Sequence, residues 1–92
     1  MSKRFRQSVG IESAPLQDEL ILFHSQTNKF CVLNCTSSFI WSQLQRPVSD
    51  EEIAQQLGQR FGGVTASDAL RDVDLALKEM LDLGLIVDVG AG

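Results

Sequence analysis

The chain has 92 residues, a formal net charge of −4 and 43% hydrophobic residues. A chain of this length forms one domain with a small core, which leaves little room for a deep catalytic cavity. Its 12 acidic against 8 basic side chains oppose a broad contact with a polyanion such as nucleic acid. The composition therefore favours a binding module over an enzyme in its own right.

No segment before Pro15 resembles a secretory signal, and the longest uninterrupted apolar run, Leu20 to Phe23, is far shorter than a membrane span. We therefore expect a cytoplasmic protein with no membrane partner, whose Cys31 and Cys35 are thiols. Structural zinc needs four nitrogen or sulfur ligands, and His24 is the sole imidazole. Neither a metal nor any other cofactor is expected.

Residues 1–13 are polar and weakly patterned. We expect them to form a flexible N-terminal segment or an extra edge strand, with the strand somewhere between Phe5 and Ile11. The basic residues Lys3, Arg4 and Arg6 are expected in a frayed tail. The folded domain is predicted to span residues 14–89.

Two apolar runs follow, ELILFH from Glu19 and KFCVL from Lys29, separated by the turn residues SQTN. They predict a β-hairpin in which Phe30 and Val32 face opposite to Cys31 and Leu33. Both strands are apolar on both sides. One face can pack on helices, whereas the other needs cover from the N-terminal segment, a dimer partner or a ligand.

Three helices are predicted after the hairpin. The first starts at an N-cap among residues 34–37, buries Trp41 and ends before Pro47. The second starts with a capping box of Ser49 and Glu52, and two glycines end it. The third is capped by Thr65 or Ser67 and runs to a stop at Gly84, with residues 85–89 as an extended tail.

The third helix carries one apolar side chain off its buried stripe. At 100° per residue, Leu75 projects nearly opposite to the stripe that contains Val73 and Leu77. A single exposed leucine normally needs no explanation.

The run from Leu33 to Leu44 resembles a family pattern, L-N-x-[ST]-x-x-x-[IV]-W-x-L. The matching residues are Leu33, Asn34, Thr36, Ile40, Trp41 and Leu44, and the pattern continues through Ser49, Glu52, Ile53, Phe61, Gly84, Leu85 and Ile86. On these residues the chain resembles the PqqD-like family (pyrroloquinoline quinone biosynthesis protein D), also called RiPP recognition elements, over roughly Leu16 to Val89. It departs from the pattern at Cys31, where an aromatic pair is common, and at Asn28, where the turn often has glycine.

The resemblance implies an α+β, winged helix-turn-helix-like domain: an N-terminal antiparallel hairpin or three-stranded sheet, then three helices. It also implies a non-catalytic module that binds the leader segment of a precursor peptide as an added strand. A modifying enzyme, such as a radical SAM enzyme or a leader peptidase, is the implied second partner. Carried onto this chain, the peptide site comprises Lys29, Phe30, Cys31, Val32 and Leu33, flanked by Arg71, Asp74, Leu75 and Lys78.

Two other readings remain open. A winged-helix DNA-binding regulator also consists of a hairpin and three helices. However, the third helix carries five acidic side chains against the basic Arg71 and Lys78, and this excess of negative charge would repel DNA phosphates. A structural dimerisation subunit is the second, because an exposed hairpin edge can pair with its own copy.

Overall fold

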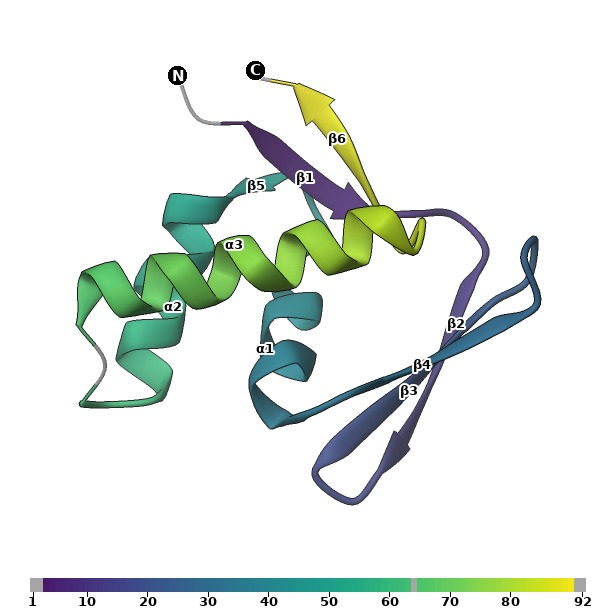
Figure 1. Ribbon diagram of the computed structural model, residues 1–92, viewed down its shortest axis with the longest axis horizontal. Helices are drawn as coiled ribbons and strands as arrows, with labels where there is room; N and C mark the ends of the chain where they lie inside the picture. Colours follow the sequence, from purple (N-terminus) through teal and green to yellow (C-terminus); the bar gives the residue numbers. More distant parts are fainter. Residues whose placement is uncertain (1–2, 64, 91–92) are drawn as a thin grey trace.

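Over residues 3–63 and 65–90, the computed structural model contains three helices and two three-stranded antiparallel sheets (Figure 1). The first sheet consists of β2 (Ile11–Leu16), β3 (Glu19–His24) and β4 (Lys29–Leu33), in that spatial order. The predicted hairpin is confirmed as β3 and β4. Its turn is closed by the N–H of Asn28, which donates to the carbonyl of His24 at 2.8 Å, and Asn28 adopts the left-handed conformation (φ 57°) that asparagine tolerates.

The second sheet places β1 (Arg4–Gln7) between β5 (Val48–Ser49) and β6 (Ile86–Gly90). Residues 4–7 of the N-terminal segment are thus a central strand and not the flexible tail or edge strand that we expected, whereas residues 11–13 begin β2, which is an edge strand. Phe5 is buried, Arg4 is paired with Glu52 at 3.5 Å, and Lys3 lies 3.8 Å from Asp88. The expected frayed tail is wrong from Lys3 onward because β1 pairs with strands distant in sequence, which a local pattern does not reveal.

The helices begin at the caps that the sequence indicates. For α1 (Cys35–Gln43), the side chain of Asn34 accepts from the N–H of Ser37 at 2.8 Å. For α2 (Asp50–Arg60), Ser49 Oγ accepts from the N–H of Glu52 at 3.1 Å and donates to Glu52 Oε1 at 3.3 Å, which confirms the capping box. For α3 (Ala66–Asp82), Thr65 is the cap and accepts from the N–H of Asp68.

The helices share one core with the inner face of the β2–β3–β4 sheet. The largest fully buried side chains come from this sheet and from all three helices: Leu22, Ile40, Leu44, Ile53, Leu57 and Val73. Trp41 is buried among them, as predicted. Figure 1 shows the helices to one side of this sheet, with α1 packed on β3 and β4, so the opposite face of the sheet carries no helix.

Residues 86–90 form β6, in agreement with the predicted extended tail. Gly84 takes a positive φ of 74° just after α3, as a glycine that ends a helix does. Within the described residues, no helix is long and apolar enough to cross a membrane.

Candidate functional site

The strand β4 is an open edge of its sheet. In the order β2–β3–β4, only β3 pairs with it among the described residues. The opposite edge, β2, contains Pro15, which has no N–H to donate and is typical of a blunted edge. Each of the five residues of β4 keeps its N–H, so β4 is the edge that suits pairing with another chain.

The side chains of β4 alternate as predicted. Phe30 and Val32 point away from the helices and are 72% and 56% exposed. Leu33 is buried and Cys31 is half-buried on the inner side. A strand that added to this edge would therefore find apolar neighbours on both faces.

The C-terminal half of α3 lies nearest to the hairpin (Figure 1). Burial raises the pKa of the Cys31 thiol, and the Glu79 carboxylate raises this pKa further, which places Glu79 close to β4. At the end of α3, a side chain on Gly84 would come within 3.4 Å of His24 Nε2. The charge of Glu79 thus acts on Cys31 of β4, and the end of α3 lies beside His24 of β3.

The four α3 residues of the predicted site share one face of the helix, within an arc of about 100°, but differ in their angle from Glu79. At 100° per residue, Leu75 lies about 40° from Glu79, Arg71 about 80°, Lys78 about 100° and Asp74 about 140°. Leu75 is 57% exposed, which confirms its predicted position off the buried stripe. By helical spacing, Leu75 is thus the one of the four that lies nearest to the Glu79 side of α3, and Asp74 lies farthest from that side.

On their shared face, all four residues line a shallow hollow of about 450 Å³ together with Ser67 and Leu70. The hollow is a continuous surface along α3. It does not reach β4, because none of its lining residues belongs to that strand.

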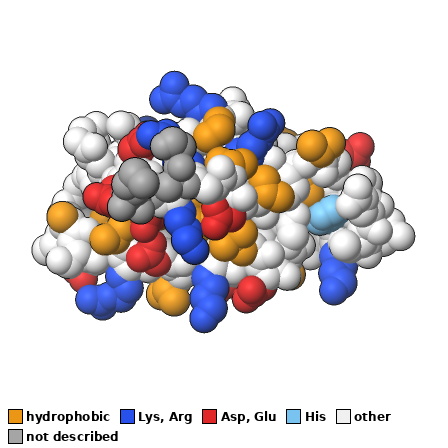
Figure 2. Space-filling model, turned by 90° about the horizontal axis from the view of Figure 1, so that it is seen from above, with side chains coloured by type: hydrophobic (Ala, Val, Ile, Leu, Met, Phe, Trp, Pro, Cys, Tyr) orange, Lys and Arg blue, Asp and Glu red, His pale blue; other side chains and the backbone are white. Residues whose placement is uncertain are grey.

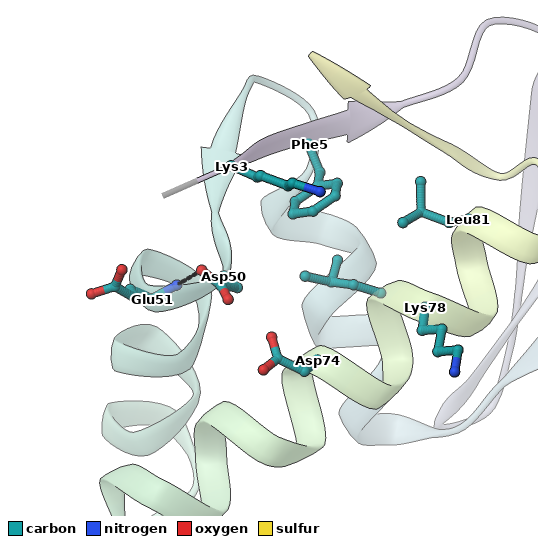
Figure 3. Close-up of a pocket in the computed structure, with 8 residues that line it drawn as sticks. Lys3, Phe5, Asp50, Glu51, Asp74, Lys78 and Leu81 are labelled. Atoms are coloured by element: carbon teal, nitrogen blue, oxygen red, sulfur yellow. Dashed lines mark hydrogen bonds between the residues drawn. The ribbon is translucent and has the colours of Figure 1, made fainter. Parts of the chain in front are cut away.

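A second and larger groove, of about 680 Å³, separates β1 and the start of α2 from the other flank of α3 (Figure 3). Its lining combines an apolar floor with charged side chains: Lys3, Phe5, Asp50, Glu51, Asp74, Leu77, Lys78 and Leu81. Sequence reasoning did not find this groove, because β1 and α3 are distant in sequence and only the β1–β5–β6 sheet brings them together.

In this groove the carboxyl groups of Asp50 and Asp74 point toward each other (Figure 3). Burial raises the pKa of Asp74, and the hydrogen bond with Asp50 and the charge of Asp50 raise this pKa further. Asp50 Oδ1 also accepts from the N–H of Glu51 at 2.8 Å. Asp74 therefore belongs to this acidic pair rather than to the Glu79 side of α3.

The described residues contain no group of three or more His, Cys, Asp or Glu side chains that could hold a metal ion. His24 is buried, and its Nδ1 accepts from the N–H of Gln26 at 3.3 Å. Its imidazole thus caps the hairpin turn. Cys31 and Cys35 are both free thiols.

These features define a small α+β domain of the winged helix-turn-helix type in which β4 is an open sheet edge. The chain belongs to the PqqD family: the family model described as "Coenzyme PQQ synthesis protein D (PqqD)" matches residues 19–86. The resemblance that the sequence indicated is thereby confirmed. No curated protein matches the chain.

Two solved structures are similar over nearly the whole chain. "TbiB1 in Complex with the TbiA(beta) Leader Peptide" has 28% sequence identity and a TM-score of 0.79, and the match covers 88% of this chain and 93% of that one. "Lasso peptide synthetase B1 complexed with the leader peptide" has 24% identity and a TM-score of 0.78, with 90% and 96% covered. The structure with 24% identity supports the fold of this chain. The structure with 28% identity supports the fold and also a family relationship.

Proposed function

We propose that this chain is a non-catalytic recognition module that binds the leader segment of a ribosomally made precursor peptide as an added β-strand. The observation that carries the proposal is the open edge of β4, a strand without proline that has apolar side chains on both faces. Membership of the PqqD family supports it. So does the similar TbiB1 structure, which is a complex with a leader peptide.

In the proposed complex, backbone hydrogen bonds to Lys29–Leu33 give affinity, and alternate side chains of the peptide give specificity. Inward side chains of the peptide would meet Cys31 and Leu75 between β4 and α3. Arg71 would lie at the outer rim. Lys78 and Asp74 would contact only a peptide that continues around α3.

The second proposed partner is the enzyme that modifies the precursor, with a radical SAM enzyme and a leader peptidase as the two expected kinds. The module itself would perform no chemistry and would need no cofactor. By holding the leader, it would raise the concentration of the precursor at the enzyme. We propose that the leader and the enzyme meet this module in the cytoplasm. Pairing of two copies of the chain through β4 would use the same edge and so compete with the leader peptide.

Charge argues against the winged-helix alternative as a DNA-binding regulator. The helix that would enter the groove, α3, carries Asp68, Asp72, Asp74, Glu79 and Asp82 against Arg71 and Lys78. On the face of the molecule that Figure 2 shows, Lys and Arg side chains are interspersed with Asp, Glu and hydrophobic side chains. A phosphate backbone requires a continuous basic surface instead.

Calorimetric titration with the leader half of any short precursor peptide that the neighbouring genes encode tests the proposal. We expect a dissociation constant of about 1 μM or lower, which corresponds to about −8 kcal/mol. A scrambled leader is the matched control. Absence of binding at high micromolar concentration would contradict the proposal, and binding to random duplex DNA in the same salt would favour the DNA-binding alternative.

A further inference from the structure

The face of the β2–β3–β4 sheet that points away from the helices is apolar. We call it the outer face. In the register of the sheet, Ala14 pairs with Ile21, Ile21 with Val32, and Phe23 with Phe30, and paired residues share a face. Together with the end of β2, the apolar residues of the outer face are Ala14, Leu16, Ile21, Phe23, Phe30 and Val32.

The outer face is ordered but uncovered. The rings of Phe23 and Phe30 lie 4.9 Å apart in a tilted arrangement, which holds both in place across the two strands. Leu16 is 51% exposed at the far end of β2. The N-terminal segment that could have covered this face lies in the other sheet as β1.

The size of the outer face argues against a stable dimer of this chain. Three strands at about 4.8 Å spacing and five to six residues at about 3.3 Å rise give roughly 250 Å² per partner. This flat footprint is well below the roughly 800 Å² of accessible surface that each partner buries in a standard interface. A contact of this size suits a partner that a second attachment already holds nearby.

Charge at the rim of the outer face favours a partner that is not a second copy. Glu12 pairs with Phe23 and Glu19 with Leu16, so both carboxylates lie on the outer face, and Asp18 lies in the turn between them. Among residues 3–63 and 65–90, none of these three forms an ion pair. Two copies face to face would bring acidic rims together, whereas a rim of Lys and Arg would be complementary.

We propose that the outer face docks the modifying enzyme, through an apolar patch on that enzyme rimmed by Lys and Arg. This inference rests on the proposed function, because the bound precursor supplies the second attachment that so small a contact requires. A peptide on the edge of β4 lies beside the sheet and not over it. Peptide and enzyme can therefore occupy the module together, and the enzyme lies next to the strand that it must act on.

The test uses β2, which is two strands away from the peptide edge. We would measure binding of any peptide-modifying enzyme that the neighbouring genes encode, with the leader present, for Ala14→Lys/Leu16→Lys and for Glu12→Lys/Glu19→Lys. Val9→Lys is the matched control, since Val9 is an exposed apolar residue outside the sheet. Each variant is also titrated with the leader alone and checked by circular dichroism.

We expect both double variants to weaken enzyme binding about tenfold or more, with leader affinity and the Val9→Lys variant unchanged. The charge reversal should also reduce the salt dependence of enzyme binding. Normal enzyme binding by folded double variants would overturn this inference and leave the proposed function intact. Failure of the unaltered chain to bind the leader would instead overturn the proposed function. A dimer of the unaltered chain that either double variant dissociates would assign the outer face to a second copy.

Discussion

Cys31 on β4 and Glu79 on α3 lie within electrostatic reach of each other. Burial raises the pKa of the Cys31 thiol most, and the Glu79 carboxylate raises this pKa further because it disfavours a nearby thiolate. The pair relates the open strand to the long helix, and the proposed peptide strand would add to β4 on the side of α3 that carries Glu79.

We predict that Cys31, measured in a Cys35→Ser background, is alkylated by iodoacetamide with an apparent pKa above that of an unfolded control. Glu79→Gln should lower this pKa only in part, because burial remains. Saturating leader peptide should slow the alkylation. The rate at several pH values measures all three effects, and a leader that binds without protecting Cys31 would move the site away from β4.

We predict that one proline substitution on β4 separates binding from folding. Alternate residues of an edge strand direct their N–H groups outward, where only an added strand can use them. If Val32 is such a residue, Val32→Pro abolishes leader binding while the fold survives, and Cys31→Pro unfolds the hairpin. Circular dichroism beside calorimetry distinguishes the two variants. A folded Val32→Pro protein with full affinity would exclude β4 as the docking strand.

We predict that Trp41→Ala lowers the free energy of unfolding by about 3 to 5 kcal/mol, the usual cost of truncating a large buried aromatic. Trp41 is 5% exposed in the shared core and so should not contact the peptide directly. Urea denaturation measures the change. A stable Trp41→Ala protein that has lost only leader affinity would show that Trp41 is part of the site.

Local signals in this sequence predicted the local structure well. Capping by Asn34 and by Ser49 with Glu52, the alternation of β4 and the exposure of Leu75 all follow from residues within a few positions of one another. Each depends on backbone geometry that the neighbouring side chains determine. These elements were therefore predictable without the fold.

Long-range pairings were not predictable in this way. The strand β1 pairs with β5 and β6, some forty and eighty residues away. Its short polar sequence shows no alternation of apolar and polar residues that would predict a central strand. For the same reason, the placement of Asp74 opposite Asp50 did not follow from the helical pattern of α3. The family resemblance predicted which strand and which helix would form the peptide site, but not the direction in which each α3 side chain points.

The acidic pair leads to a prediction about pH. Because the folded-state pKa of Asp74 is raised, the unfolded chain loses this proton first as pH rises above the ordinary value of about 3.9. The ionised pair therefore lowers stability at neutral pH, and acidification removes the penalty. Asp74→Asn should raise the free energy of unfolding at pH 7 by a few tenths of a kcal/mol, since Asp74 is largely exposed and solvent screens its charge.

The same Asp74→Asn variant should show no gain at pH 3, where the carboxyl groups are protonated in either state. Asp72→Asn, on the same helix and outside the groove, is the control. Thermal melting at both pH values provides the comparison, and an NMR titration of the Asp74 carboxyl should show its pKa fall in Asp50→Asn. An equal gain at pH 3 and pH 7 would mean that helix propensity, not charge, causes the effect.

We predict that Leu75→Asp weakens leader binding and leaves the fold intact. Leu75 is exposed and lies about 40° around α3 from Glu79, so its replacement should change stability by no more than about 0.5 kcal/mol. A leucine buried under an added strand can contribute roughly 1 to 2 kcal/mol to binding, and affinity should therefore fall about five- to thirtyfold. Leu81→Asp is the control, because it makes the same change on the flank of α3 that faces Phe5. If both variants bind the leader normally, the peptide does not contact α3; if Leu75→Asp melts sharply lower, Leu75 supports the fold rather than the site.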